Sequence, residues 1–280
     1  MVSLVILSYN TVALLAECIS SVYKNVKDLD FEIIVVDNNS TDHSVHIVKT
    51  KFPKVRVIES DKNLGFAGGV NLGVKHARGD LVLLLNSDTR VDSGSVKTLV
   101  EFIGENENVA VVGGKLKNKD GTSSSSYSSF YTPLQIFLFL FGRKQGKSNV
   151  KNPIPVDWVS GGFMLVRKDI FDRVNGLDPH FFMYIEDMEF CYRLKKKGYE
   201  VYYNPRATVE HVGQGSSNRT FAIIQIYKGL LYFYKKHRKG EYVLVKGMLI
   251  VKAGMSLLVG YITGNSYLKT TYREVFRQAI

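Results

Sequence analysis

The chain has 280 residues, 45% of them apolar, which is enough to bury a sizeable core and excludes an intrinsically disordered protein. The formal net charge is +11, and ten basic residues against two glutamates place +8 of it in residues 221–280, leaving +3 for the first 220. We therefore expect the C-terminal end to bind an anionic partner. By charge alone, this partner could be lipid headgroups or nucleic acid.

The first half of the chain alternates short apolar segments with helical patterns. Strands are predicted at Val2 to Leu7, Phe31 to Val36, Val55 to Ile58 and Leu81 to Leu85. Helices are predicted near Thr11 to Tyr23, Thr41 to Lys51 and Gly68 to Ala77. Strands that are apolar throughout are covered on both faces, so the pattern indicates a doubly wound α/β fold, a parallel sheet flanked by helices.

The segment Gly121 to Asn152 interrupts this alternation with a serine cluster, an apolar stretch and the basic stretch RKQGK, and we interpret it as an inserted loop with an amphipathic or interfacial element. Regular structure then resumes. The pattern predicts strands at Val159 to Val166, near Glu200 to Tyr203 and near Ala207 to His211, and a helix from Glu186 to Lys197 whose Arg193 and Lys195 to Lys197 form a solvated face.

After Gly215 the pattern is helical to the end of the chain. The most hydrophobic part, Gly247 to Ile262, has sixteen residues and contains Lys252. A membrane-spanning helix needs roughly twenty apolar residues. We therefore expect this stretch to lie on a membrane or pack against a partner without crossing.

The two cysteines, Cys18 and Cys191, each fall in a predicted amphipathic helix. Neither has metal-ligand spacing or an evident pairing partner, which is typical of buried thiols in a reducing compartment. The N-terminal residues lack the basic segment and cleavage site of a secretory signal, so we expect the protein to stay in the cytoplasm.

Polar residues follow each of the first four predicted strands. They are Ser8, Tyr9 and Asn10 after the first strand, Asp37, Asn38, Asn39 and Ser40 after the second, Asn63, Gly65 and Phe66 after the third, and Asn86, Ser87 and Asp88 after the fourth. Ligands of open parallel sheets bind outside the carboxyl ends of the strands. Each group alone could merely cap a helix or form a turn, but their recurrence at successive strand ends favours a ligand site.

These residue types suit a nucleoside diphosphate. Tyr9 can offer a ring face to a base, Asp37 can accept a hydrogen bond from a base N–H, and the glycine-rich turn NLGFAGG lets backbone amides approach. A departing diphosphate needs a divalent cation, and a hard oxygen ligand such as Asp88 suits Mg²⁺ or Mn²⁺. The sequence has neither a Walker lysine motif nor GxGxxG, which disfavours a P-loop or dinucleotide site.

Six segments together resemble glycosyltransferase family 2, especially its rhamnosyltransferase-like branch: VSLVILSYN, VVDNNSTD, NLGFAGGVNLG, LLLNSDT, GGFMLVRKDIFDRVNGLDPHFFMYIEDMEFCYRLKKKGY and ATVEHVGQGS. The resemblance covers roughly Met1 to Ser217 and implies a GT-A fold with a mixed, mainly parallel sheet, an inverting mechanism and a nucleotide-sugar donor. It implies a GT-A domain over 1–217, with a nucleotide-sugar-binding half (1–115) and an acceptor-binding half (153–217), followed by a basic amphipathic helical tail over 218–280.

The resemblance also assigns roles within the site. Asn86, Ser87 and Asp88 stand in the place of the DxD metal motif, and because Asn86 replaces the first carboxylate, Asp88 should be the main protein carboxylate on the metal. His211 stands where related enzymes can place a further metal ligand. The Glu186–Asp187 pair supplies the general base, for which Asp187 is preferred and Glu186 is the alternate, although acidic residues at a helix start are favoured by the backbone dipole alone.

Three residues are candidates for acceptor binding. Gly161 and Gly162 could leave room for a sugar or form a bulge. Trp158 could stack on a sugar ring or pack in the core.

The leading hypothesis is a transferase at the inner face of the cell membrane that uses a dTDP-sugar such as dTDP-rhamnose, or a UDP-sugar, to extend a glycan or lipid-linked glycan of a surface polysaccharide. The tail would bind the anionic membrane surface rather than nucleic acid, and homo-oligomerisation stays open. A nucleotide-sugar nucleotidyltransferase is an alternative, but the glycine-rich, basic N-terminal signature of that class is missing. A nonenzymatic lipid- or nucleic-acid-binding module would leave the strand-end carboxylates unexplained.

Overall fold

The computed structural model describes residues 1–124, 126–140, 150–212 and 219–280. The chain forms two compact units. The first consists of the described parts of Met1–Phe130, Lys147–His180 and Asp187–Ser216, and the second of the described parts of Tyr131–Gly146, Phe181–Glu186 and Ser217–Ile280. The second unit therefore includes two segments that precede the C-terminal helices in the sequence.

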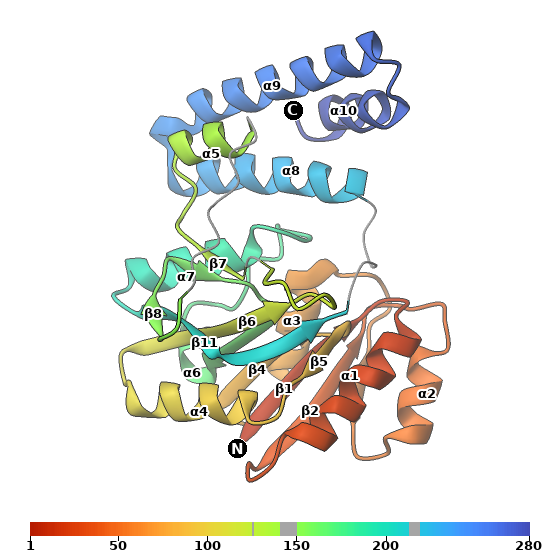
Figure 1. Ribbon diagram of the computed structural model, residues 1–280, viewed down its shortest axis with the longest axis vertical. Coiled ribbons are helices and arrows are strands. Elements are labelled where there is room, and N and C mark those ends of the chain that lie inside the picture. Colours follow the sequence, from red (N-terminus) through yellow and green to blue (C-terminus); the bar gives the residue numbers. More distant parts are fainter. Residues whose placement is uncertain (125, 141–149, 213–218) are drawn as a thin grey trace. The chain divides into compact units, whose positions relative to one another are not determined.

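The first unit is built on a mixed, mainly parallel sheet with the strand order β3-β2-β1-β4-β10-β6-β11-β5, in which β8 also pairs with β11 (Figure 1). β10 runs antiparallel to β4 and β6, and β5 runs antiparallel to β11. β7 and β9 form a separate two-stranded sheet. The strands are β1 (Val2–Ser8), β2 (Phe31–Asp37), β3 (Arg56–Glu59), β4 (Leu81–Asn86), β5 (Thr89–Val91), β6 (Val109–Lys117), β7 (Tyr127–Ser128), β8 (Ile154–Pro155), β9 (Trp158–Val159), β10 (Phe163–Arg167) and β11 (Glu200–His211).

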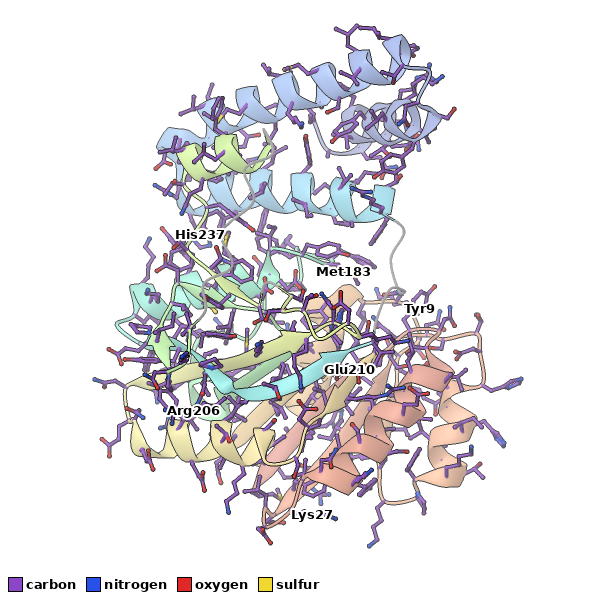
Figure 2. The ribbon with its side chains drawn as sticks, in the orientation of Figure 1. Tyr9, Lys27, Met183, Arg206, Glu210 and His237 are labelled. Carbon is purple, nitrogen blue, oxygen red and sulfur yellow. The ribbon has the colours of Figure 1, made fainter. Side chains whose placement is uncertain are left out.

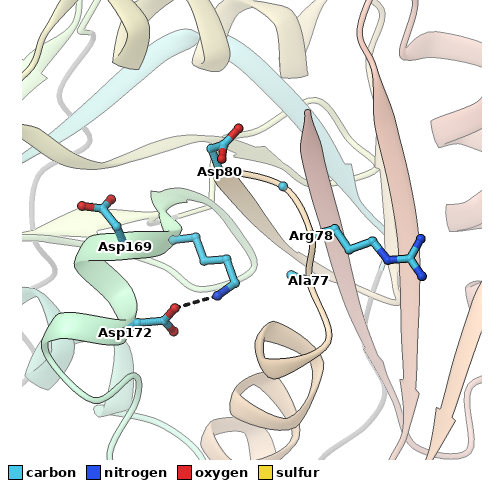
Figure 3. Close-up of a pocket in the computed structure, with 7 residues that line it drawn as sticks. Ala77, Arg78, Asp80, Asp169 and Asp172 are labelled. Carbon is cyan, nitrogen blue, oxygen red and sulfur yellow. Dashed lines mark hydrogen bonds and ion pairs between the residues drawn. The ribbon is translucent and has the colours of Figure 1, made fainter.

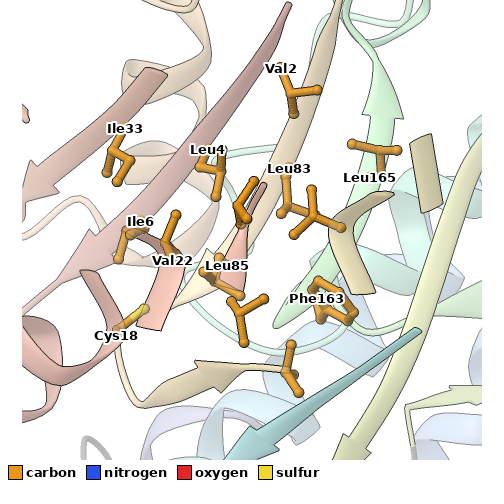
Figure 4. Close-up of a cluster of buried hydrophobic side chains, with 14 of the residues drawn as sticks. Val2, Leu4, Ile6, Cys18, Val22, Ile33, Leu83, Leu85, Phe163 and Leu165 are labelled. Atoms are coloured by element: carbon orange, nitrogen blue, oxygen red, sulfur yellow. The ribbon is translucent and has the colours of Figure 1, made fainter. Parts of the chain in front are cut away.

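Both faces of this sheet are buried, as the continuous apolar segments predict. Successive residues of a strand point to opposite faces, so Leu4 and Ile6 belong to one hydrophobic cluster and Val5 to the other. The first cluster, shown in Figure 4, is covered by α1 (Val12–Asn25) and α4 (Ser95–Glu105). The second is covered by α3 (Gly65–Lys75), α6 (Lys168–Arg173) and α7 (Glu186–Lys196), while α2 (Ser44–Lys51) packs beside α1 and β3.

Two glycines let α3 lie directly on β1. A Cβ atom at Gly69 would approach a Leu7 methyl carbon to 2.3 Å, and one at Gly73 would approach a Val5 methyl carbon to 2.4 Å. Real Cβ atoms do not come so close, so a larger residue would push the helix off the strand. Because α3 begins at the turn after β3, this close packing also fixes the start of the helix near the carboxyl edge of the sheet.

The elements predicted in the first half are present, but two elements predicted in the second half differ. The strand predicted from Val159 to Val166 is wrong: the chain turns at Ser160–Gly162, which separates β9 from β10. The two strands predicted near Glu200 and Ala207 are one strand, β11, with an irregularity between Asn204 and Thr208. Helices α4 and α6 and strands β5, β6, β7 and β8 were not predicted.

The second unit is helical: α5 (Pro133–Leu140), α8 (Arg219–His237), α9 (Lys239–Ile262) and α10 (Ser266–Gln278). α9 contacts the other three helices, and the Tyr234 hydroxyl of α8 donates a hydrogen bond to the carbonyl of Tyr131. α5 lies in the predicted interfacial segment, whereas the basic stretch RKQGK at 143–147 and the sequence around Gly215 lie outside the described residues. The predicted helical end of the chain is confirmed over the residues described.

One premise about the tail needs correction. The apolar stretch predicted as sixteen residues belongs to α9, which has 24 residues and a mean hydropathy of 1.8 in its most apolar window. By length and composition this helix could cross a membrane. Helix length therefore gives no reason to exclude a span.

Candidate active site

The loops that follow β1 and β2 are tied together by hydrogen bonds. Asn10, in a left-handed conformation with φ +54°, accepts a hydrogen bond at Oδ1 from the Thr41 amide at 2.7 Å, and its own amide donates to Ser40 Oγ at 2.9 Å. Tyr9, in the loop that follows β1, is 41% exposed (Figure 2). Asn10 of the first strand end is therefore held against Ser40 and Thr41 of the second, and the accessible ring of Tyr9 precedes Asn10 in the chain.

Asp37 is almost fully buried at the end of β2, with 4% of its surface exposed. Its Oδ2 accepts a hydrogen bond from the Ser40 amide at 2.9 Å. Its Oδ1 has no hydrogen-bond partner among the described residues. Because a buried carboxylate oxygen without a donor is costly, this atom has the properties of an acceptor for a ligand N–H.

Asn38 fixes the turn after β3, a role that the sequence analysis missed. Its buried amide Nδ2 donates to Asn63 Oδ1 at 2.9 Å and to the Gly65 carbonyl at 3.0 Å, while its Oδ1 accepts from the Leu64 amide at 2.9 Å. Gly65 starts α3 at φ +71°, a conformation that favours glycine. Asn39, also left-handed at φ +68°, is exposed instead. Asn38 is among the predicted strand-end residues, but the sequence gives no signal for its role in fixing the turn after β3.

The Asn86–Ser87–Asp88 segment meets the end of β11. β5 pairs with β11 so that Thr89 lies opposite His211, and the Val212 amide donates to the Asp88 carbonyl at 2.8 Å. This pairing places His211 Nε2 3.3 Å from Asp88 Oδ1, and the hydrogen bond to Asp88 raises the pKa of His211. The two predicted metal ligands are therefore brought together.

Ser87 connects this segment to the first strand. Thr11 Oγ1 donates to Ser87 Oγ at 3.1 Å and lies 3.0 Å from Ser8 Oγ. Ser8 and Ser87 are both buried. The ends of β1 and β4 are thus held together by a chain of hydroxyl groups, and Thr11 is a residue of this site that the sequence did not single out.

The Glu186–Asp187 pair begins α7, as predicted. Asp187 accepts hydrogen bonds from the Met188 amide at Oδ1, 2.8 Å, and from the Gly161 amide at Oδ2, 3.3 Å. Burial raises the pKa of Asp187 to about 6, while these backbone hydrogen bonds act in the opposite direction. Glu186 is buried as well. A carboxylate with a pKa near 6 is suited to accept a proton at neutral pH.

The turn Ser160–Gly162 joins the carboxylate of Asp187 to the Asn86 segment. The Gly162 carbonyl accepts a hydrogen bond from the Asn86 amide at 3.1 Å. A Cβ atom at Gly161 would lie 2.9 Å from the Phe66 ring, and one at Gly162 would lie 3.0 Å from Asn86 Nδ2. The space next to these glycines is therefore occupied by Phe66 and Asn86, and contact with an acceptor stays a prediction.

Trp158 is partly buried in β9, where its Nε1 donates to the Ser129 carbonyl at 3.0 Å. It packs against the second hydrophobic cluster. A role in acceptor binding stays a prediction.

A separate hollow lies at the opposite end of β4, where the strand begins (Figure 3). An ion pair of 2.6 Å between Lys168 Nζ and Asp172 Oδ2 closes one of its sides. None of the predicted site residues lines it. The lining residues are Ala77, Arg78, Gly79, Asp80, Lys168, Asp169 and Asp172.

A family model described as glycosyl transferase family 2 matches residues 3–174, more than half of the chain. The chain belongs to glycosyltransferase family 2. A model described as the N-terminal domain of galactosyltransferase matches residues 144–214 of this family 2 protein. Together the two matches span the strand-end loops, Asp187 and His211.

Three curated relatives match between 56% and 71% of the chain. The low-salt glycan biosynthesis hexosyltransferase Agl10 of Haloferax volcanii is 26% identical over 71% of this chain and 63% of its own length. The N-acetylglucosaminyl-diphospho-decaprenol L-rhamnosyltransferase of Mycobacterium tuberculosis is 25% identical over 67% of this chain and 68% of its own length. The rhamnosyltransferase WbbL of Escherichia coli is 31% identical over 56% of this chain and 64% of its own length. The resemblance to the rhamnosyltransferase-like branch is confirmed.

Solved structures confirm the GT-A fold of this family 2 protein. GalNAc-T7, solved with UDP, GalNAc and Mn²⁺, matches with a TM-score of 0.61 at 19% identity over 84% of this chain and 49% of its own. The mannosyltransferase PcManGT of Pyrobaculum calidifontis, solved with GDP-Man and Mn²⁺, matches with a TM-score of 0.59 at 15% identity over 99% of this chain and 85% of its own.

Proposed function

We propose that this chain is an inverting, divalent-metal-dependent glycosyltransferase that moves a sugar from a nucleoside diphosphate to a hydroxyl of an acceptor glycan. One observation carries the proposal. A single backbone turn, Ser160–Gly162, contacts the Asp187 carboxylate on one side and the Asn86 amide on the other. The same three residues thereby hold the proposed proton acceptor, Asp187, and the Asn86–Ser87–Asp88 segment proposed to bind the metal and the diphosphate.

Asp187 is the general base of this proposal. Inversion by single displacement needs one carboxylate that takes the proton from the acceptor hydroxyl as its oxygen attacks the sugar. Two backbone amides fix the orientation of the Asp187 carboxylate, and its pKa of about 6 keeps it mostly ionised at neutral pH. Glu186, the alternate, is more deeply buried than Asp187.

Asp88 and His211 fit a divalent cation. A carboxylate oxygen and an imidazole nitrogen are ligands that Mn²⁺ accepts, and the carboxylate also suits Mg²⁺. The described residues contain no group of three or more His, Cys, Asp or Glu side chains placed to hold a metal. The donor diphosphate would therefore complete the coordination, and the bound cation would supply charge neutralisation for the leaving group. The Mn²⁺ and nucleotide ligands of the two similar structures support this assignment.

The nucleotide would bind at the ends of β1 and β2. The unsatisfied Oδ1 of Asp37 would accept the ring N–H that uracil and thymine both carry, and the exposed ring of Tyr9 would stack on the base. The mycobacterial relative and WbbL, named as rhamnosyltransferases, support dTDP-rhamnose as a donor to test beside UDP-sugars.

The acceptor proposed here is a glycan or lipid-linked glycan at the inner face of the cell membrane. The name of the mycobacterial relative includes a diphospho-decaprenol acceptor, and the C-terminal unit of this chain is strongly basic. A basic surface beside an anionic membrane would keep the enzyme near such a substrate.

Incubation of the protein with a panel of nucleotide-sugars and Mg²⁺ or Mn²⁺ tests the proposal. We expect slow hydrolysis of a UDP- or dTDP-sugar that EDTA abolishes and fresh metal restores. Release of a nucleoside monophosphate with a sugar phosphate would indicate pyrophosphate-bond chemistry instead, as in the nucleotidyltransferase alternative.

A further inference from the structure

α9 has a buried face and an exposed face of different character. The buried face is the one that packs on the neighbouring helices α5, α8 and α10, and it consists of Val245, Leu249, Ala253, Ser256 and Gly260. The exposed face, which we call the outer face of α9, consists of Val243, Leu244, Ile250, Val251, Met255, Leu258, Val259, Tyr261 and Ile262. Exposure in this set reaches 78% at Val243 and 75% at Ile262. Contiguous apolar surface of this extent marks an interaction site.

The outer face is free of charge. With about 100° between successive residues of a helix, its members fall within an arc of about 180°. Within this arc there is no charged side chain from Val243 to Ile262. The two lysines of this stretch lie outside it, Lys246 about 40° beyond one edge and Lys252 about 20° beyond the other. An apolar half flanked by lysines is the pattern of a helix that lies in a membrane interface, where lysine stems extend toward the headgroups.

The charge of the second unit favours lipid over a second copy of the chain. Residues 221–280 carry +8, and their two acidic residues already pair with arginines of the same unit: Glu241 with Arg238 at 2.5 Å and Glu274 with Arg277 at 2.8 Å. A second copy docked on the outer face would bring positive charge against positive charge. An anionic bilayer would instead neutralise it.

The neighbours of α9 make a membrane span unfavourable. α8 carries Lys228, Lys235 and Lys236, and α10 carries Lys269 and Arg273. A spanning α9 would have to take these charges into hydrocarbon or give up the packing of Val245, Leu249 and Ala253, which are fully buried. Docking of the outer face alone has neither cost.

We propose that α9 lies in the plane of an anionic membrane surface, with its outer face among the lipid chains and Lys246 and Lys252 at headgroup level, and does not cross the bilayer. This specifies the membrane attachment proposed above and rests on it. Donor hydrolysis in solution does not depend on it, so the two proposals can fail separately.

Vesicle sedimentation with the full chain tests the surface. Val251→Glu combined with Leu258→Glu should weaken binding to phosphatidylglycerol vesicles at least tenfold, since two charges would enter the lipid. Thr50→Glu combined with Thr270→Glu changes the net charge equally at exposed positions outside the face and should bind within about twofold of the unaltered chain. If both double variants lost vesicle binding equally, net charge alone would explain the loss and the proposal would be overturned. The proposal would also be overturned if the unaltered chain formed a dimer in solution and did not bind vesicles, and if the Val251→Glu/Leu258→Glu variant were a monomer.

Cysteine labelling tests the orientation without relying on glutamate variants. Cys18 and Cys191 are buried, so an added cysteine would be the one that the reagent reaches. Gly240→Cys lies near the start of α9, and Ser266→Cys lies just beyond its end, at the start of α10. In spheroplasts that express the chain, a membrane-impermeant maleimide should label neither site until the membrane is permeabilised, and then both. Labelling of one end from outside would show a span and overturn the in-plane arrangement.

Discussion

His211 Nε2 lies 3.3 Å from Asp88 Oδ1, so the last residue of β11 meets the loop between β4 and β5. The pairing of β11 with β5 creates this contact between residues that are far apart in the sequence. Under the proposed function, Asp88 and His211 would share a divalent cation with the donor diphosphate, so the affinity for the cation should depend on both residues.

Asp88→Asn and His211→Ala should each weaken Mn²⁺ binding in the presence of UDP by more than roughly tenfold, because each removes one of the two proposed protein ligands. Titration followed by electron paramagnetic resonance measures the free Mn²⁺ directly. His76→Ala, at the half-buried C-cap of α3, is the control and should bind Mn²⁺ normally. Undiminished Mn²⁺ affinity in His211→Ala would remove the histidine from the metal site.

Asp187→Asn should lower transfer roughly 10²- to 10⁴-fold while donor binding is retained, because the amide cannot accept the acceptor proton. Asp169→Asn on α6 replaces an exposed carboxylate and should leave transfer unchanged. If Asp187→Asn retained full transfer activity, another group would be the base, and Glu186 would be the first to test.

The pH dependence of sugar transfer should reflect the ionisation of the Asp187 carboxylate. A base must be deprotonated to act, and the pKa of Asp187 is raised to about 6 by burial, so kcat/KM should fall as the pH decreases through about 6. An acid limb near the ordinary pKa of an aspartate, about 4, would mean that Asp187 is not the group observed.

Asp37→Asn should raise the donor KM about tenfold to a hundredfold with little change in kcat, since a charged hydrogen bond to the base would be lost in the ground state and transition state alike. Asp80→Asn, at an exposed position before β4, is the control. A fall in kcat with an unchanged donor KM would place Asp37 in the chemistry rather than in nucleotide binding.

Gly229→Ala should lower kcat and the melting temperature together. Tyr184 and Ile185, just before Glu186 and Asp187, have φ of +67° and +70°, a strained conformation for these residues, and a Cβ at Gly229 of α8 would lie 2.9 Å from Ile185 Cγ1. Displacing this turn should disturb the carboxylate pair that follows it while the donor KM stays unchanged.

Two variants complete the Gly229 experiment. Gly247→Ala also replaces a glycine in a helix of the same unit, but nothing lies within 4 Å of its Cβ, so activity should be unchanged. Adding Ile185→Gly to Gly229→Ala removes the clash with the Ile185 side chain and the strain at Ile185, and should restore part of kcat. If Gly229→Ala and Gly247→Ala behave alike, the turn does not position Asp187.

The strand-end residues could be predicted because the first four strands are buried on both faces and leave a clear hydrophobic signal, as at Leu4 and Val5. The meeting of Asp88 and His211 could not be derived from that signal, because it depends on β5, a three-residue strand without a recognisable pattern. Only the resemblance to the family indicated it.

Arg193 shows a second limit of sequence patterns. The sequence predicts it on a solvated helix face, but its Nε donates to both carboxylate oxygens of fully buried Glu189, at 3.0 and 2.9 Å, and its Nη2 donates to the Gly176 carbonyl at 2.6 Å. The prediction for Arg193 is wrong because helical periodicity does not reveal that the residue one turn earlier is a buried carboxylate. Charge-assisted bonds of this kind are set by tertiary packing.

The most direct test of the central claim is a thermal-shift screen of UDP-, dTDP- and GDP-sugars, each with and without Mn²⁺. A metal-dependent glycosyltransferase with its cation shared between Asp88, His211 and the donor should be stabilised by one UDP- or dTDP-sugar only when Mn²⁺ is present, and Asp88→Asn should lose that shift. A chain whose melting temperature is unmoved by every nucleotide-sugar, or moved equally after EDTA treatment, would contradict the account.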